Sequence, residues 1–181
     1  MGLYISYSIK EGFILMNSVH NRYLDILFTT ITWLGDGIFI VAMAVLFFII
    51  RKKQLAVLSI SSYLLSGLVA QILKRTINSP RPKTVFMNTD YTILVDNSSL
   101  YALNSFPSGH TASAFALATV LALYLSNKNY GCLLIIYACL VGYSRVYLAQ
   151  HFLIDIICGS VIGVLSGIAC WFMVRKWMKI K

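Results

Sequence analysis

The sequence predicts an all-helical integral membrane protein that folds as a single domain. Of its 181 residues, 59% are hydrophobic and only 12% are charged, and the mean hydropathy is +0.77. A soluble domain of this size could not bury so much apolar surface, so the composition indicates a membrane protein. Several apolar stretches also reach or approach about 20 residues, the length that an α-helix needs to cross the hydrocarbon layer.

The N-terminal part, residues 1–34, is apolar but interrupted by polar and charged side chains. These are Lys10, Glu11, His20, Arg22 and Asp25. Such a pattern is typical of helices that lie in the membrane interface, and we interpret the segment as one or two interfacial N-terminal helices. The alternative is a sixth span. The segment lacks the charged start, apolar run and small-residue cleavage site of a signal peptide.

Five further stretches are expected to span the membrane. The four long ones are residues 55–73, 111–125, 130–147 and 152–174. The fifth, residues 38–50, is short unless residues 33–37 extend it. Short connections at residues 51–54 and 126–129 join consecutive spans on one side. The sequence therefore predicts a bundle of five clear transmembrane helices.

One long segment without a continuous apolar run, residues 78–107, separates two of the spans. It contains Pro80, Pro82 and the polar run 96–99, so we expect a loop, on the outer face of the membrane. Ordered loops of this length are usually functional. No repeat, low-complexity tract or linker divides the chain, so one membrane-embedded domain is expected over residues 1–181. Asp36, between two glycines, is interpreted as a helix breaker, with a place near the functional site as the alternative.

The distribution of charge predicts which side each connection faces. A net charge of +9 could indicate a nucleic-acid partner, but many cations fall between or after spans on one side, which the positive-inside rule assigns to the cytoplasm. These are Arg51, Lys52, Lys53, Lys128, Arg175, Lys176, Lys179 and Lys181. All the acidic residues would lie on the other side. Five cations lie there against the bias, which indicates a chemical role: Lys74, Arg75, Arg81, Lys83 and Arg145.

The four cysteines lie within the apolar stretches. They are Cys132, Cys139, Cys158 and Cys170, and no two of them form a CxxC pair. The spacing therefore supports neither a disulfide framework nor a zinc site. We interpret these residues as small buried hydrophobic side chains.

The first candidate motif, KRTINSPRP at residues 74–82, supplies cations. Lys74 and Arg81 are seven residues apart and share a face for as long as one helix continues, although Pro80 and Pro82 limit that helix. A guanidinium fork makes two parallel charge-assisted hydrogen bonds to a phosphate, and a lysine adds a mobile point charge. The alternative is that these cations bind lipid headgroups at the interface.

The second motif, PSGH at residues 107–110, stands immediately before an apolar helix. Ser108 suits the N-cap position, and Gly109 allows an anion to approach the backbone closely. Free amides at a helix N-terminus bind anions, with the helix dipole in support. His110 would then lie in the first turn, within reach of a leaving-group oxygen. The alternative is a capped helix start with an interfacial histidine.

The third motif, SRVYLAQHFLID at residues 144–155, is the most specific. His151 and Asp155 are four residues apart, so they lie on one face of a helix, and the carboxylate can orient the imidazole and free its other nitrogen as a nucleophile. Asp155 is also the only acidic residue inside an apolar stretch, which makes it a functional candidate. The alternatives are a structural ion pair between Arg145 and Asp155, and a zinc site, which the neighbouring cations oppose.

Together these motifs resemble the three signatures of the type-2 phosphatidic acid phosphatase family, which also includes the vanadium-dependent haloperoxidases. The signatures are Lys-x6-Arg-Pro, Pro-Ser-Gly-His and Ser-Arg-x5-His-x3-Asp, in this order. The matching positions are Lys74, Arg81, Pro82, Pro107, Ser108, Gly109, His110, Ser144, Arg145, His151 and Asp155. The resemblance covers about residues 34–163, most of the chain.

The resemblance implies a role for each matched side chain. His151 would be the nucleophile that forms a phosphohistidine, Asp155 would orient it, and His110 would protonate the leaving group. The phosphoryl oxygens would be held by Lys74, Arg81, Arg145 and the amides of Ser108 and Gly109. No metal or other cofactor is implied. The family core usually has six spans, whereas this sequence has five clear ones.

We therefore expect a lipid phosphate or pyrophosphate phosphatase at the outer face of a bacterial inner membrane. Candidate substrates, from the resemblance alone, are undecaprenyl pyrophosphate, phosphatidylglycerophosphate, phosphatidic acid and the phosphates of lipid A. The alternatives are a lipid phosphotransferase that uses the same phosphohistidine and a non-catalytic membrane protein that binds anionic lipids. A membrane-embedded chain suits lipid substrates better than a diffusible halide, which disfavours haloperoxidase chemistry. The sequence indicates no nucleic-acid partner and no obligate protein partner.

Overall fold

The computed structural model describes residues 2–95, 100–127 and 129–178. These residues form helices and contain no β-strand, which confirms the predicted all-α class; an isolated bridge joins Pro80 and Leu103. The helices are α1 (Gly2–Met16), α2 (Arg22–Trp33), α3 (Gly37–Ile49), α4 (Lys53–Ile77), α5 (Pro82–Phe86), α6 (Gly109–Tyr124), α7 (Tyr130–Tyr147) and α8 (Leu153–Met178).

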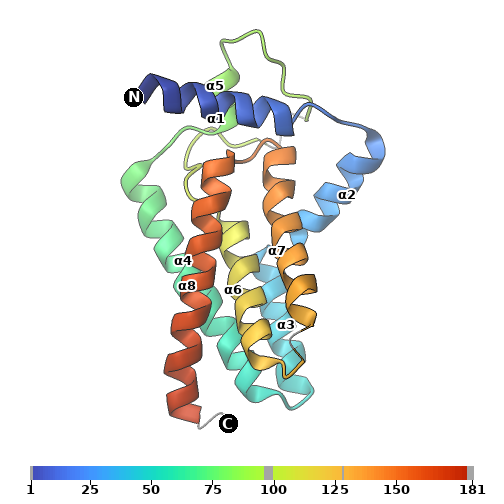
Figure 1. Ribbon diagram of the computed structural model, residues 1–181, viewed down its shortest axis with the longest axis vertical. Helices are drawn as coiled ribbons and strands as arrows, with labels where there is room; N and C mark the ends of the chain where they lie inside the picture. Colours follow the sequence, from blue (N-terminus) through green and yellow to red (C-terminus); the bar gives the residue numbers. More distant parts are fainter. Residues whose placement is uncertain (1, 96–99, 128, 179–181) are drawn as a thin grey trace.

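Helix α6 is the central helix of the bundle. Helices α4, α7 and α8 all pack against it, and α3 packs mainly against α4 (Figure 1). The side chains that α6 buries are mostly small, which allows its neighbours to approach closely. They include Ala112, Ser113, Ala114, Ala116 and Ala118. The helix is therefore enclosed by protein along most of its length.

A row of glycines brings α8 into direct contact with α6. Gly159, Gly163 and Gly167 follow one another at intervals of four residues, so they lie on one face of α8. A Cβ atom at Gly159 would lie only 2.6 Å from the carbonyl oxygen of Ser108, and one at Gly167 only 2.7 Å from the side chain of Thr119. Larger side chains would separate the two helices. The row therefore holds the start of α8 beside the start of α6.

The structure supports only part of the predicted number of spans. Helices α4, α7 and α8 are long and apolar enough to cross a membrane, and α2 with α3 would make a fourth span that is bent by 55°. Residues 111–125 fall in α6, an apolar helix of 16 residues. Residues 38–50 form only the second half of the bent pair. Five clear transmembrane helices are thus not confirmed, because α6 is packed inside the bundle and α3 does not continue straight into α2.

The break between α2 and α3 has a local cause. The carboxylate of Asp36 caps α3 by accepting a hydrogen bond from the amide of Ile38 at 2.8 Å. Gly35 lies so close to its neighbours that a Cβ atom there would be 2.5 Å from Val141 and 2.8 Å from the carbonyl oxygen of His110. The chain therefore bends at a glycine beside the start of α6. This bend brings Asp36 next to His110.

Helix α1 lies across the ends of α7 and α8 rather than parallel to them (Figure 1). Phe13 is fully buried, and its ring contacts those of Phe86 and Phe152 at 5.2 and 5.5 Å between centroids. The buried Asn17 side chain donates to the carbonyls of Val146 and Tyr147. These contacts hold α1 against the end of the bundle. The location of α1 in the membrane interface stays a prediction. Helix α2, by contrast, is the first half of the bent pair that it forms with α3.

The basic connections lie at the end of the bundle opposite α1. This end contains the turn between α3 and α4 and the end of α8 (Figure 1). The described cations there are Arg51, Lys52, Lys53, Arg175 and Lys176. Lys128, Lys179 and Lys181 of the same predicted set lie outside the described residues, as does the polar run 96–99 with its acid Asp96. The two ends therefore differ in charge.

Candidate active site

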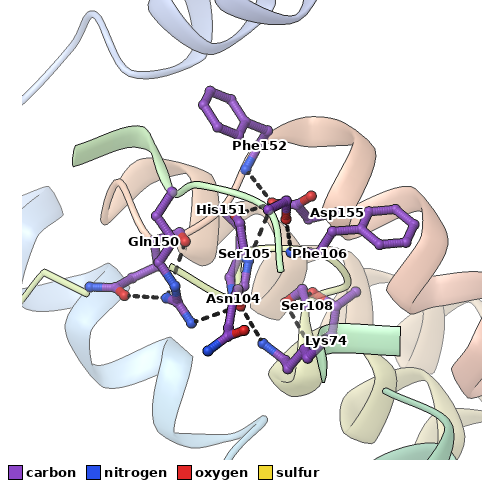
Figure 2. Close-up of polar contacts among 12 residues, drawn as sticks. Lys74, Asn104, Ser105, Phe106, Ser108, Gln150, His151, Phe152 and Asp155 are labelled. Carbon is purple, nitrogen blue, oxygen red and sulfur yellow. Dashed lines mark hydrogen bonds and ion pairs between the residues drawn. The ribbon is translucent and has the colours of Figure 1, made fainter. Parts of the chain in front are cut away.

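All three sequence motifs meet at the end of the bundle that is covered by α1 and α5. Helix α4 ends there, α6 begins there and α7 turns into α8 there (Figure 1). Figure 2 shows Lys74, Ser108, His151 and Asp155 gathered around the segment 104–106. Residues far apart in the sequence thus come together because the helices alternate in direction.

His151 lies in the tight turn between α7 and α8. Ala149 adopts a left-handed conformation with φ 50°. The amides of Gln150 and His151 both donate to the carbonyl of Arg145, at 2.9 and 3.2 Å. The turn therefore closes off the end of α7, as left-handed caps do, and directs His151 back towards the start of α6.

The environment of His151 favours a neutral ring. Only 2% of the residue is exposed. Burial lowers the pKa of His151 to about 3, with further lowering by the guanidinium groups of Arg145 and Arg81, while the hydrogen bond with Asp155 opposes the shift. The imidazole is therefore uncharged at neutral pH, with one ring nitrogen protonated and the other carrying a free lone pair.

Asp155, in the first turn of α8, lies against one edge of this ring. Its Oδ2 atom is 3.4 Å from Nδ1 of His151 and accepts hydrogen bonds from the Phe152 amide at 2.9 Å and the Ser105 hydroxyl at 2.5 Å. The Ser105 oxygen is also 3.5 Å from Nδ1 (Figure 2). These contacts fix the carboxylate beside Nδ1, which leaves Nε2 on the ring edge that faces away from Asp155.

Lys74 and Arg81 converge through the loop rather than through one helix. Helix α4 ends at Ile77, and Asn78 caps it in a left-handed conformation with φ 44°. One helix therefore does not continue from Lys74 to Arg81, as Pro80 and Pro82 led us to expect, and the two residues do not share a helix face; Arg81 is instead the N-cap of α5. The two side chains meet at the carbonyl of Asn104, which lies 2.8 Å from Lys74 Nζ and 3.4 Å from an Arg81 nitrogen.

Two buried guanidinium groups flank His151. Arg81 and Arg145 are each only 8% exposed. Arg81 donates to neutral oxygens of Leu103, Asn104 and Gln150. Arg145 donates to the Thr32 hydroxyl at 2.7 Å, and its buried Nε has no hydrogen-bond partner among the described residues. The ion pairs of the described residues involve histidines only, so the predicted alternative of an Arg145–Asp155 pair is not formed.

The PSGH motif begins α6 as the sequence predicts. Ser108 is the N-cap, and its hydroxyl oxygen accepts hydrogen bonds from the amide and the hydroxyl of Thr111 at 3.4 and 2.8 Å. Its own amide donates to the Asp155 carbonyl at 3.1 Å. The Ser108 amide is therefore already engaged, which corrects the expectation that it holds a phosphoryl oxygen. Gly109 is the first residue of α6, so its amide has no partner within the helix.

His110 faces the bend between α2 and α3. Its Nε2 atom lies 3.6 Å from the Asp36 carboxylate, and both side chains are about one-third exposed. Asp36 therefore has two contacts, because it also caps α3. The sequence suggested helix breaking as its main role and proximity to the site as the alternative, and the structure combines the two. This pairing fixes the His110 ring at the mouth of the site.

Three further residues complete the site, and the motifs do not contain them all. Ser105 contacts Asp155, Asn104 supplies the carbonyl that receives Lys74, and the Gln150 side chain accepts from Arg81 at 2.8 Å. Gln150 stands at one of the unspecified positions of the third motif. Asn104 and Ser105 are polar residues shortly before PSGH, and this proximity was the only feature of the sequence that could have indicated their place in the site. Their backbone positions depend on the fold of the loop.

An apolar groove leads away from the site between α3 and α4. Near the site it has a volume of about 540 Å³ and is lined by His110, Lys74 and Gly67, where a Cβ atom would meet nothing within 4 Å. A second apolar hollow of about 430 Å³ continues between the same helices as far as Phe48. Leu64 lines both. The groove thus connects Lys74 and His110 at one end of the bundle with apolar surface on the outer side of α3 and α4.

The described residues hold no group of three or more histidine, cysteine or acidic side chains arranged to bind a metal ion. His151 and Asp155 lie together, but His110 pairs with Asp36 instead. The cysteines are unpaired, and their exposure differs: Cys132 and Cys139 are exposed, Cys158 is half-buried and Cys170 is buried. The first two correct the expectation that all four are buried, because α7 presents them on its outer surface.

Comparison with known proteins identifies the family. The model of the PAP2 superfamily matches residues 55–179. Phosphatidylglycerophosphatase B of Bacillus subtilis is 32% identical over 160 residues, which cover 81% of this chain and 73% of that protein. Lipid A 4'-phosphatase of Porphyromonas gingivalis is 32% identical over 87% of this chain and 69% of its own length. A match to the lipid A 1-phosphatase of the same organism covers 36% of this chain and only 15% of that protein.

A solved structure has the same fold. The crystal structure of Aquifex aeolicus LpxE superposes with a TM-score of 0.77 at 32% identity, and the match covers 90% of this chain and 93% of that one. The family match includes all three motifs, and it confirms the resemblance that the motifs indicated. The chain belongs to the PAP2 superfamily and is an integral membrane phosphatase of the PAP2 type.

Proposed function

We propose that this protein removes a phosphate or pyrophosphate group from a membrane lipid through a phosphohistidine on His151, at the outer face of a bacterial inner membrane. His110 is the acid that protonates the leaving group, and Asp155 positions the His151 ring. The phosphoryl oxygens are bound by Lys74, Arg81, Arg145 and the amide of Gly109. No metal takes part.

The observation that carries this proposal is the pair of buried guanidinium groups. Buried charges are normally paired, because an unpaired ion in a protein interior is costly. Among the described residues, Arg81 and Arg145 donate hydrogen bonds to neutral oxygens only, Arg81 also lies over the Tyr101 ring, and Arg145 keeps an unpartnered Nε. Both lie close enough to His151 to lower its pKa. A phosphoryl group would supply the anion that both guanidinium groups lack.

The first chemical step forms a bond between Nε2 of His151 and phosphorus. The ring is neutral, so Nε2 offers its lone pair, while Nδ1 keeps its proton and shares it with Asp155 at 3.4 Å. The bond from phosphorus to the leaving-group oxygen breaks, and that oxygen takes a proton from His110. In the second step water attacks phosphorus, His110 accepts a proton, and the bond to His151 breaks with release of phosphate.

The groove between α3 and α4 supports a lipid as the substrate. Lys74 and His110 line its upper part and would lie beside the phosphate, while the part between Leu64 and Phe48 is apolar. A hydrocarbon chain placed there would keep its contact with the interior of the membrane. Family relatives named as phosphatases of phosphatidylglycerophosphate and lipid A are consistent with such a substrate.

The direct test measures phosphate release by the purified protein in detergent. The panel contains phosphatidic acid, phosphatidylglycerophosphate, a polyprenyl diphosphate and a lipid A phosphate. We expect release in the presence of EDTA and inhibition by orthovanadate, which mimics the five-coordinate phosphoryl transition state. Activity that is lost in EDTA and returns with a divalent metal would contradict the mechanism. A second lipid that takes up the labelled phosphate in place of water would indicate a phosphotransferase.

Orientation in the membrane is tested by labelling single cysteines in intact spheroplasts. The background carries no native cysteine, and the two sites are Asn88, which is exposed beside the candidate site, and Asn127, which is exposed at the opposite end. The positive-inside rule places the basic end in the cytoplasm. A membrane-impermeant maleimide is therefore expected to label Asn88→Cys without lysis, and Asn127→Cys only after permeabilisation. The reverse pattern would place the site in the cytoplasm.

A further inference from the structure

A second cleft opens from His110 on the side of α2, opposite the apolar groove. Its volume is about 490 Å³, within the range of small-molecule sites. Like the part of the groove nearest the site, it has polar lining residues, with Asp25 and Thr29 from α2, and Arg145 and Gln150 from the end of α7 and the turn after it. His110 lines both the groove and this cleft. Whatever is bonded to the oxygen that His110 protonates therefore lies at the entrance to both.

Of the described residues that line this cleft, Asp25 is the only acidic one, and its carboxylate is held by two polar contacts. Its Oδ1 atom accepts a hydrogen bond from the Tyr147 hydroxyl at 2.6 Å and lies 3.0 Å from Nδ1 of His20. The His20 ring packs on the Tyr147 ring at 4.1 Å between centroids. The other oxygen, Oδ2, accepts no hydrogen bond from the described part of the chain. The side chain of Asp25 is 51% exposed, so Oδ2 remains available to a ligand.

The other lining residues limit what such a ligand can be. A cationic group would meet Arg145, and an anionic group would meet Asp25. An uncharged group with hydroxyls avoids both penalties, because its hydroxyls can donate to Asp25 and Thr29. Apolar side chains of the cleft, such as Leu148, can cover its carbon atoms. Carboxylate, hydroxyl and amide groups beside apolar surface suit a glycerol or sugar unit.

We propose that this cleft binds the hydroxyl-bearing head group next to the scissile phosphate, and that Asp25 accepts hydrogen bonds from those hydroxyls. The inference rests on the proposed function, because it assigns the leaving group of that reaction. The lipid chain occupies the groove between α3 and α4, and the glycerol or sugar unit occupies the cleft beside α2. The enzyme therefore prefers phosphate esters of polyol-containing lipids to esters of simple long-chain alcohols.

The test compares three phosphate monoesters of matched chain length in detergent. Phosphatidylglycerophosphate and a glycolipid 1-phosphate carry hydroxyls beside the phosphate, whereas hexadecyl phosphate does not. For Asp25→Asn, we expect the ratio of kcat/KM for the polyol lipids to kcat/KM for hexadecyl phosphate to fall about tenfold, mainly through KM, since a hydroxyl loses a charged acceptor. Loss of preference for only one polyol lipid identifies that unit, glycerol or sugar, as the ligand.

The matched control is Glu11→Gln, the same change of carboxylate to amide at an exposed position of α1, which should leave the ratio unchanged. If Asp25→Asn does not fold, Thr29→Val removes a second polar group from the cleft and is expected to lower the ratio by a smaller factor. A ratio that does not change, or an equal loss on all three esters, would overturn the inference and leave the proposed function intact. Absence of hydrolysis of any ester by the wild type would instead refute the proposed function.

Discussion

Replacement of His151 with alanine is expected to lower turnover at least about a thousandfold while the protein remains folded, because loss of a nucleophile removes the covalent route. The ring lies within 3.4 Å of the Asp155 carboxylate and is almost completely buried. Turnover is measured on purified protein whose elution from a size-exclusion column matches that of the wild type.

A trapping experiment distinguishes loss of the nucleophile from a general disturbance of the site. With a lipid whose phosphate is labelled, the wild type should yield labelled protein that is stable in alkali and labile in acid, as a phosphoramidate is. The His151→Ala variant should yield none. If the variant retains more than a tenth of wild-type activity, or is labelled to the same extent, His151 is not the nucleophile.

Replacement of Arg145 with lysine should lower kcat about a hundredfold, the scale of losing a preorganised donor to a transition-state oxyanion. Arg145 uses one nitrogen to hold Thr32 and has a second, Nε, without a partner among the described residues. Lysine retains the charge but cannot donate from two fixed positions at once. The expected loss therefore tests geometry rather than charge.

The matched control for this variant is Arg75→Lys, one residue after Lys74 but exposed on the outer surface of α4. It should keep wild-type kcat. Single-turnover and steady-state rates on one lipid phosphate separate binding from chemistry. An Arg145→Lys variant with normal kcat and only a raised KM would show that Arg145 binds the substrate without stabilising the transition state.

The sequence by itself determined the fold class and the residues at the centre of the site. Hydropathy is a property of composition, so it predicted an all-helical membrane protein before any contact was known. The spacing of His151 and Asp155 is local and predicted correctly that the two side chains meet, although His151 lies in the turn before α8 rather than on the predicted helix face. Ser108 as the N-cap of α6 followed from the same kind of local rule. These predictions depend on residues that are near one another in the chain.

Only the tertiary structure decided the features that depend on distant segments. The predicted count of five clear spans is not confirmed, because α6 is short and the chain bends at Gly35, where it packs against Val141 and the start of α6. Lys74 and Arg81 meet at a loop carbonyl, although their spacing suggested one helix face.

The same holds for Ser105 beside Asp155 and for Asp36 beside His110, which are separated from their partners by 50 and 74 residues. No local pattern encodes such pairs. Their positions are set when α8 packs its glycine row against α6 and when the loop between α4 and α6 folds back over the site. Periodicity specifies which face a residue occupies, whereas the contact that it makes depends on which element finally covers that face.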